Sequence, residues 1–310
     1  MLSRGDLTDD EWAVLEPLLP KSNNRCGRWR DHRQVINGII YRVSTGCQWR
    51  ELPTRFGPWQ TIHKRHMFWS IDGTWETLLR HVQAVADSEG DIDWDINIDS
   101  TSIRTHLHAA GAPKTAATLS ATSKGAAERS AHMRGLVSAA VLGGGGAAGE
   151  ALGRSRGGLT TKLHLSADGK CRPLSLVVTP GQRADCTQFE AVMDKIRVPR
   201  LGPGRPRRRP DSVGADKAYS NRRTRTYLRE RGIRHVIPEK RDQAAGRLRR
   251  GSRGGRPPGL DKDRYKKRNT VERAINKLKQ FRAVATRYDK RGYVFLGTVT
   301  AAALLIWLRS

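Results

Sequence analysis

The hydrophobic period of the chain changes near Asp91, and this change constrains the fold more than any other feature of the sequence. Before residue 89, apolar residues recur at helical spacing, as on the buried face of an α-helix. At residues 92–98, isoleucine and tryptophan alternate with aspartate and asparagine, which is typical of a β-strand with one buried face. The sequence therefore predicts an α/β protein, with an all-α region at residues 1–88 and a sheet-containing domain at residues 91–310.

Four helices are predicted in the N-terminal region. Their start and end signals are the capping box of Thr8 and Glu11, the N-cap Asp31, the terminating Gly46, the apolar stripe from Trp59 and the opening Thr74. The second and third helices, joined by a segment with glycine and proline, are compatible with a helix-turn-helix-like unit. Any small helical bundle produces the same apolar stripes. We expect residues 1–88 to bind DNA, with Lys64 and Arg65 of the third helix among the contacts.

The charge of the chain indicates a polyanionic partner. The 57 lysines and arginines exceed the 30 aspartates and glutamates, which gives a net charge of +27. Nucleic acid is the first candidate for such a partner. We expect no membrane partner, because no apolar run approaches the roughly 20 residues of a membrane-spanning helix. The first residues do not resemble a signal peptide, so we expect a cytoplasmic protein, with its scattered cysteines reduced rather than holding zinc.

The sheet domain is predicted to place a carboxylate at the end of a second strand. Residues 160–167 and 173–179 are predicted as two strands joined by a turn at Asp168 and Gly169. Residues 212–215 are predicted as a short strand that delivers Asp216, and Asp99 is predicted to end the strand at 92–98.

Two segments of the sheet domain have a composition that does not fold alone. Residues 109–158 are rich in alanine, glycine and serine, and residues 240–262 are rich in arginine, glycine and proline. We expect flexible loops at about 109–158 and 240–262, the second of which could be a solvated linker or could settle on phosphates. The apolar residues near 300–308 predict a buried C-terminal helix.

A late stretch places one carboxylate among cations on a predicted helical face. At helical spacing, Tyr265, Arg268, Glu272 and Lys279 lie on one side of such a helix, beside an apolar stripe that would dock it on a core. Arginine and lysine at these positions suit phosphate oxygens. An alternative remains open, because Asn269 and Glu272 also match a capping box, which would make Glu272 a structural cap and would place Tyr265 and Arg268 outside the helix.

The spacing of three carboxylates along the chain suits metal-dependent phosphoryl transfer. That chemistry needs carboxylates from several elements to converge, and Mg²⁺ prefers oxygen ligands. Asp99, Asp216 and Glu272 meet this requirement if neighbouring strands hold the aspartates and a helix packed on the sheet supplies the glutamate. Singly, each also fits a structural role, since Asp99 could be another polar residue of the outer face and Asp216 a partner of Lys217.

The residues of this late stretch resemble a known family. Tyr265, Arg268, Glu272 and Lys279 are similar in identity and spacing to the Y-R-E-K signature of DDE transposases of bacterial insertion sequences, in the insertion-sequence-five group. The segments that surround Asp99 and Asp216, which read IDST and GADKAYS, also resemble this family. So do the N-terminal segments LTDDEWAVLEPLLP and CQWRELP.

The resemblance implies a ribonuclease-H-like mixed-sheet catalytic domain that follows the helical DNA-binding domain. By this resemblance Asp99, Asp216 and Glu272 are catalytic and hold Mg²⁺, for which Mn²⁺ can substitute. Arg268 and Lys279 would contact DNA phosphate, with Tyr265 in support. The partners implied are double-stranded DNA, as element ends and as target, and further copies of the chain in a synaptic complex near the bacterial nucleoid. The reaction implied is strand cleavage at terminal inverted repeats followed by strand transfer.

Two other functions remain open from the residues. A non-catalytic DNA-binding protein, such as a repressor derived from a transposase, is compatible with the charge and with the helical region. A general nuclease of the same fold would cut DNA without regard to terminal sequence. Cleavage of end-containing DNA in Mg²⁺ separates these functions.

Overall fold

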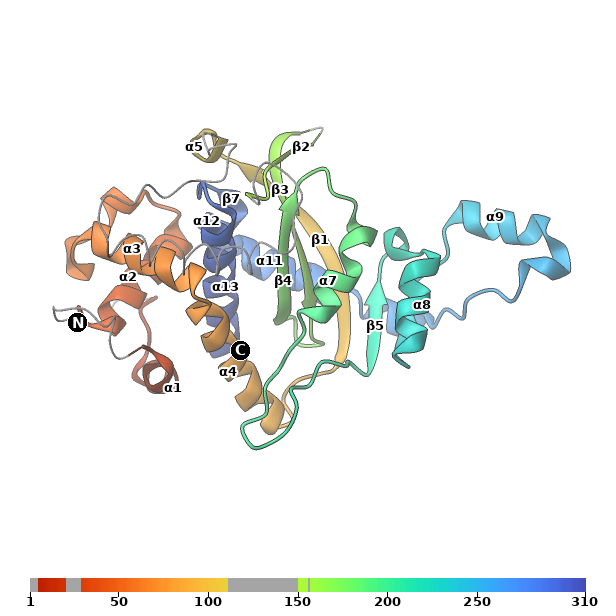
Figure 1. Cartoon of the computed structure of the whole chain (residues 1–310), viewed down its shortest axis with the longest axis horizontal. Helices are drawn as coiled ribbons and strands as arrows, with labels where there is room; N and C mark the ends of the chain where they lie inside the picture. Colours follow the sequence, from red (N-terminus) through yellow and green to blue (C-terminus); the bar gives the residue numbers. More distant parts are fainter. Residues whose placement is uncertain (1–4, 21–28, 111–149, 156) are drawn as a thin grey trace, which may run out of the picture.

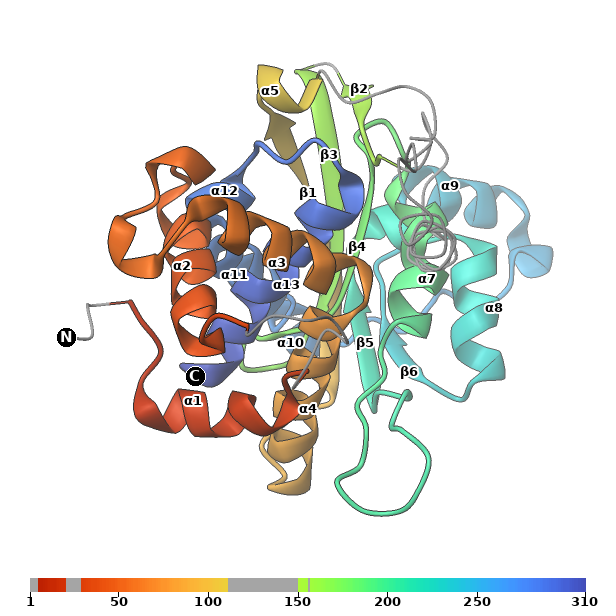
Figure 2. The same ribbon diagram turned by 60° about the vertical axis from the view of Figure 1, so that its left-hand side comes forward.

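The computed structural model describes residues 5–20, 29–110, 150–155 and 157–310. A mixed sheet occupies the middle of the molecule (Figure 1), and helices lie on both of its faces. Helices α11 (Asn269–Gln280) and α13 (Gly292–Leu308) pack on one face, and α7 (Phe189–Asp194) packs on the other. The N-terminal helices lie beyond α13, as the turned view in Figure 2 shows. The α/β class with a mixed sheet and an N-terminal helical region is confirmed.

The four predicted N-terminal helices are present, with the predicted start and end signals. They are α1 (Asp9–Leu15), α2 (His32–Thr45), α3 (Trp59–Ile71) and α4 (Thr74–Ser88). Thr8 and Glu11 form the capping box before α1, and the Asp31 side chain caps α2. Gly46 ends α2 in the left-handed conformation, where a side chain would be strained. Short 3-10 turns follow at η1 (Glu16–Leu18), η2 (Trp49–Glu51) and η3 (Thr54–Phe56).

The strands of the described residues pair around β1. Their bounds are β1 (Asp95–Thr105), β2 (Gly153–Ser155), β3 (Gly158–Ala167), β4 (Pro173–Pro180), β5 (Ser212–Ala215), β6 (Arg234–Val236) and β7 (Thr286–Arg287). The order is β2-β3-β1-β5-β6, while β4 pairs with β3 and β7 with β1. Strands β3 and β4 are antiparallel to their neighbours, whereas β5 and β6 run parallel to β1. The predicted hairpin and the predicted strand at 212–215 are confirmed.

The prediction for the first strand is wrong in its bounds. Ile92 and Trp94 are buried as expected but precede β1, which starts at Asp95 and continues to Thr105. Because the second half of β1 pairs with β3 from Ser100 to Arg104, Asp99 lies inside the strand rather than at its end.

The remaining helices follow the sheet. They are α5 (Leu107–Ala110), α8 (Arg222–Glu230), α9 (Arg241–Arg249), α10 (Lys262–Lys266) and α12 (Arg282–Ala285), with 3-10 turns η5 (Asp185–Gln188), η6 (Lys217–Tyr219) and η7 (Gly251–Gly254). The predicted buried C-terminal helix is confirmed as α13, which begins at Gly292. No helix among the described residues is long and apolar enough to cross a membrane.

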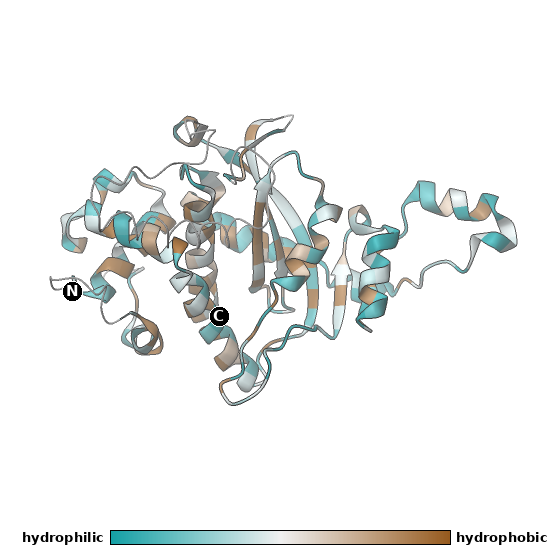
Figure 3. Cartoon of the chain, in the orientation of Figure 1, coloured by the Kyte–Doolittle hydropathy of each residue, from teal (hydrophilic) through white to brown (hydrophobic). Residues whose placement is uncertain are grey.

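The two predicted loops contain secondary structure where the chain is described. Residues 111–149 and 156 of the first lie outside the described residues, but 153–155 form β2. In the second, α9 projects away from the sheet (Figure 1), and α8 and α9 are largely hydrophilic (Figure 3). The loop prediction is wrong for 241–249 because Gln243 fastens the start of α9, accepting from the Lys240 backbone N–H at 3.4 Å and donating to the Ser220 carbonyl at 2.7 Å.

A chain of buried hydrogen bonds ties the N-terminal helices to the end of the polypeptide. The Trp75 indole N–H donates to His66 Nδ1 at 3.1 Å, so that ring carries its proton on Nε2, 3.1 Å from Thr298 Oγ1. The Thr298 hydroxyl donates to Asp289, which also binds the Arg42 guanidinium at 2.9 Å. These helices also share one hydrophobic cluster with the sheet. The division at residues 88–91 into separate domains therefore stays a prediction.

The burial of His66 makes stability depend on pH. Burial lowers the pKa of His66 from 6.5 to about 3. Between these values the unfolded chain binds one proton more than the folded chain, so stability is lost as pH falls. The free energy of unfolding should therefore decrease by about 1.4 kcal/mol per pH unit below pH 6.5. Urea denaturation at pH 5 to 7 measures this slope, and His66→Gln should reduce it. A slope in His66→Gln equal to that of the wild-type protein would contradict the assignment of this pH dependence to His66.

Candidate active site

Asp99 and Asp216 follow two paired residues of parallel strands. The register of β1 and β5 pairs Ile98 with Ala215, so the next residues are Asp99, inside β1, and Asp216, which directly follows β5. Burial raises the pKa of Asp99, and the negative charge of Asp216 adds to this effect, while the Ser100 N–H and the Arg268 guanidinium oppose it. Two carboxylates in this arrangement repel each other and favour a cation between them.

Glu272 is linked to the first aspartate through an arginine. Arg268 Nη1 donates to Asp99 Oδ2 at 3.0 Å, and Arg268 Nη2 donates to Glu272. The side chain of Glu272 is 46% exposed, whereas those of Asp99 and Arg268 are 22% and 18% exposed. The glutamate therefore lies at the solvent side of this group and the aspartate at its buried side.

Asn97 fastens the start of α11 to the sheet beside these residues. Its amide donates to Thr270 Oγ1 at 2.7 Å and to the Lys267 carbonyl at 3.3 Å. Its opposite neighbour on β5 is Gly214, where an added Cβ would lie 2.1 Å from the Asn97 Oδ1. The lack of a side chain at Gly214 therefore leaves space for the Asn97 amide, which binds the start of the helix that carries Glu272.

The prediction of one continuous helix from Tyr265 to Lys279 is wrong. The chain forms α10 and α11 with Arg268 between them, because i→i+3 hydrogen bonds from Arg268 to Tyr265 and from Thr270 to Lys267 tighten the backbone there. The capping-box alternative is correct in placing Tyr265 and Arg268 outside the helix of Glu272, but it is wrong about the cap, since α11 has no side-chain cap. Tyr265 lies near Arg268, with its ring centroid 5.9 Å from the Arg268 guanidinium carbon. Lys279 lies two helical turns beyond Glu272 on α11.

The donor set fits a hard divalent cation by its chemistry, since carboxylate oxygens are the ligands that Mg²⁺ prefers. The structure brings Asp99 beside Asp216 and joins Asp99 to Glu272 through Arg268. It does not gather three acidic, histidine or cysteine side chains of the described residues closely enough to hold a metal. The Arg268 guanidinium, which bridges two of the carboxylates, neutralises the charge that a cation would otherwise meet.

A polar network that sequence reasoning missed adjoins the aspartates. Ser100, which follows Asp99, donates its hydroxyl to Asp185 at 2.6 Å, and Lys162 pairs with the same carboxylate at 2.9 Å. Tyr219 is 1% exposed, and its hydroxyl has no hydrogen-bond partner among the described residues. Burial, with the charges of Asp185 and Asp99, raises the pKa of Tyr219. The only sequence signal for this network is the proximity of Ser100 and Tyr219 to the two predicted aspartates.

The two predicted DNA contacts on α3 differ in their surroundings. Lys64 is exposed. Arg65 is 8% exposed, binds His32 Nδ1 at 2.9 Å, and lies with its guanidinium carbon 3.8 Å from the centroid of the Trp29 ring. This packing engages Arg65 inside the helical region, whereas the Lys64 side chain faces solvent. A DNA contact by either residue stays a prediction.

Comparisons with known proteins place the chain in a family. Residues 7–79 match a family described as "Putative transposase of IS4/5 family", and residues 93–307 match the family "Transposase DDE domain". No solved structure matches the chain significantly.

Curated relatives include two proteins described as transposases. The chain is 30% identical over 151 residues to the "Putative transposase for insertion sequence element IS6501" of Brucella ovis, a match that covers 49% of this chain and 100% of the relative. It is 34% identical over 131 residues to the "Putative transposase for insertion sequence element IS402" of Burkholderia cepacia, covering 42% of this chain and 54% of the relative. With the match of residues 93–307, these relatives show that the chain belongs to the DDE transposases of insertion sequences.

Proposed function

We propose that the chain binds the terminal inverted repeats of its insertion sequence and catalyses Mg²⁺-dependent DNA strand cleavage and strand transfer. The observation that carries this proposal is the position of Asp99 on β1 and of Asp216 directly after the adjacent parallel strand β5, with Glu272 linked to Asp99 through Arg268. The mixed sheet, antiparallel on one side of β1 and parallel on the other, supports a ribonuclease-H-like catalytic domain.

The residues of the site have distinct roles in this proposal. Asp99, Asp216 and Glu272 would hold Mg²⁺, for which Mn²⁺ can substitute. When bound, two divalent cations activate the attacking oxygen and stabilise the leaving oxygen of a phosphodiester. Arg268 presents a planar group with five donors, which suits phosphate oxygens. Lys279 supplies a further positive charge on α11, the helix that follows Arg268. Tyr265 supports Arg268 from the preceding helix.

The same proposal assigns the partners. The helices of residues 1–88 bind double-stranded DNA through exposed cations such as Lys64, and several copies of the chain hold two element ends in one complex. The charge of +27 supports binding to DNA in the bacterial cytoplasm and nucleoid.

A second function, non-catalytic DNA binding, is favoured by one observation. Arg268 pairs with two of the three carboxylates, and no three potential ligands of the described residues converge on one point. In that case the chain would bind element ends and would not cut them.

One experiment separates the candidates. The full-length chain is incubated with a labelled linear fragment that carries candidate ends, with and without Mg²⁺. Cleavage at the ends only in Mg²⁺ is the expected result. Binding without cleavage would support the non-catalytic protein, and cleavage that ignores the terminal sequence would indicate a general nuclease.

A further inference from the structure

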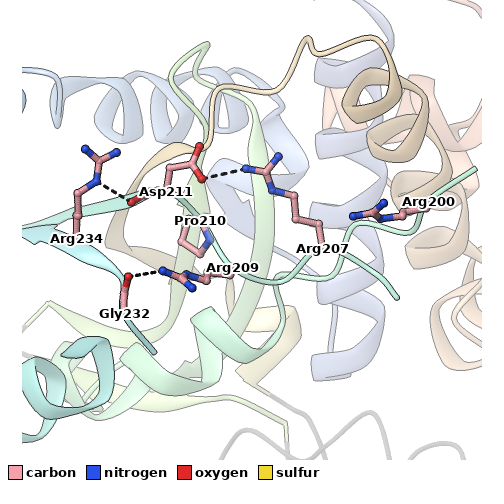
Figure 4. Close-up of a pocket in the computed structure, with 7 residues that line it drawn as sticks. All are labelled: Arg200, Arg207, Arg209, Pro210, Asp211, Gly232 and Arg234. Atoms are coloured by element: carbon pink, nitrogen blue, oxygen red, sulfur yellow. Dashed lines mark hydrogen bonds and ion pairs between the residues drawn. The ribbon is translucent and has the colours of Figure 1, made fainter. Parts of the chain in front are cut away.

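The edge of the sheet far from the candidate active site carries a concentration of arginines. Residues 197–234 contain 13 lysines and arginines against three acidic residues. Four of these arginines, Arg200, Arg207, Arg209 and Arg234, line a surface hollow with Asp211 and Gly232 (Figure 4). We call this feature the β6 hollow. Gly232 and Arg234 also line a second hollow beside Arg229 of α8, so the basic surface continues along the edge strand.

Three of the four arginines have no acidic partner within the described part of the chain. Arg209 donates to the Gly232 carbonyl at 2.5 Å, and Arg234 donates to the Asp211 carbonyl at 3.4 Å. Neither of these, nor Arg200, forms an ion pair among residues 5–20, 29–110, 150–155 and 157–310. Their charges are therefore free to meet an anion.

The fourth arginine serves to shape the hollow. Arg207 pairs with Asp211 at 3.1 Å and with Asp87 at 3.7 Å, and its guanidinium carbon lies 4.1 Å from the centroid of the Trp94 ring. This stacking fixes one wall of the hollow against the end of α4. In Figure 4, Arg200 lies beside Arg207, the Arg209 side chain points toward Gly232, and Arg234 lies on the other side of Asp211, so the arginines are spread along the hollow.

The strands relate the hollow to the candidate active site. Asp211 directly precedes β5, and Asp216 directly follows it. At about 3.3 Å per residue, the hollow and the carboxylates lie roughly 16 Å apart along one strand. Phosphates of one DNA strand are spaced about 3.4 Å along the helix axis. Because one helical turn spans about 34 Å, a phosphate of the same strand roughly 16 Å along the axis faces away from the protein. With the reacting phosphate at the carboxylates, the phosphates that could lie over the hollow are those of the complementary strand, across one groove.

We propose that the β6 hollow binds the phosphate backbone of the complementary strand, across one groove from the reacting bond, through Arg200, Arg209 and Arg234. The inference rests on the proposed function, because the groove is located relative to the bond that Asp99, Asp216 and Glu272 would cleave. The contact carries no sequence information, since phosphates are the same at every base pair.

A pair of charge-matched triple variants tests this proposal. Arg200→Gln/Arg209→Gln/Arg234→Gln removes three charges from the hollow. The control, Arg80→Gln/Arg223→Gln/Arg231→Gln, removes three charges that already pair with Glu76, Glu190 and Asp194. Arg223 lies on α8 and Arg231 directly follows this helix, and both pair with acidic residues of α7, so the control shares the neighbourhood but not the hollow.

The measurement is the salt dependence of DNA affinity for the full-length proteins. Each phosphate contact contributes about 0.9 to the slope of log affinity against log salt concentration, so the hollow variant should lose about 2.7 from this slope. The slope for the control variant should fall by less than about 0.9, the contribution of one phosphate contact. Equal losses in the two variants, or no loss in either, would overturn the proposal.

A second measurement uses the wild-type protein and so does not depend on the variant folding. Neutral methylphosphonates are placed one at a time along both strands of an end-containing duplex. The expected result is weaker binding when the substitution lies in the complementary strand, across one groove from the cleaved bond. Uniform binding at every position of that strand would overturn the proposal. Failure of the wild-type protein to cleave in Mg²⁺, with the slope difference intact, would reject the proposed reaction while retaining the DNA contact.

Discussion

Glu272→Gln is expected to reduce Mg²⁺-dependent DNA cleavage about a thousandfold or more, because cation ligation contributes several kcal/mol and each 1.36 kcal/mol is tenfold in rate. Glutamine keeps the length of the side chain and its acceptor for Arg268, but it lacks the charge that would hold a cation. Binding of element ends should be largely unchanged. Single-turnover cleavage and gel-shift titration measure the two properties.

The control for this variant is Glu76→Gln, which removes a carboxylate from an exposed ion pair with Arg80 on α4. It should cleave at the wild-type rate. Wild-type cleavage by Glu272→Gln as well would show that Glu272 is not a ligand and would return it to the structural role of an ion-pair partner for Arg268.

Asp289→Ala is expected to lower the free energy of unfolding by about 3–5 kcal/mol, because it leaves a buried guanidinium without its counter-charge. The side chains of Arg42 and Asp289 are 3% and 4% exposed, and Thr298 donates to the same carboxylate at 2.9 Å. Burial alone would raise the pKa of Asp289, but Arg42, Thr298 and Arg287 outweigh it and hold this pKa below its usual value. The carboxylate is therefore charged at neutral pH.

Urea denaturation followed by circular dichroism measures this loss. The matched control is Asp263→Ala, because Asp263 pairs with Lys266 at 3.1 Å in an ion pair whose side chains are 91% and 79% exposed. An exposed pair contributes at most about 1 kcal/mol. A loss as small as this at Asp289 would mean that the buried network does not hold the N-terminal helices to α13.

Elements with local signals could be predicted from the sequence. The capping box of Thr8 and Glu11, the N-cap Asp31 and the left-handed Gly46 act within a few residues, so their patterns are visible in one stretch of chain. The extent of β1 could not be predicted in this way. Residues 100–105 do not alternate in hydrophobicity, and they are held in the strand by pairing with β3, which is distant in sequence.

The candidate site shows the same contrast. The positions of Asp99 and Asp216 follow from strand patterns, and Glu272 follows from the family signature. The break of the helix at Arg268 followed only from the capping-box alternative, and the hydrogen bonds of Asn97 to Thr270 and to the Lys267 carbonyl depend on tertiary contacts. The burial of Arg65 likewise depends on tertiary contacts.

The network around Asp185 could not be predicted from the sequence, for a similar reason. Ser100 meets this carboxylate only because η5 lies over the β1–β3 pair, an arrangement set by the sheet register. No periodicity within residues 185–196 indicates that Asp185 contacts Ser100 and Lys162.

Cation binding by the full-length chain on end-containing DNA tests the central claim most directly, namely that three carboxylates from distant parts of the chain form one metal site. Electron paramagnetic resonance of Mn²⁺ reports the bound cation. The account predicts that Asp99→Asn, Asp216→Asn and Glu272→Gln each weaken Mn²⁺ binding at least about tenfold, whereas Glu76→Gln does not. Wild-type Mn²⁺ affinity in all three variants would contradict it.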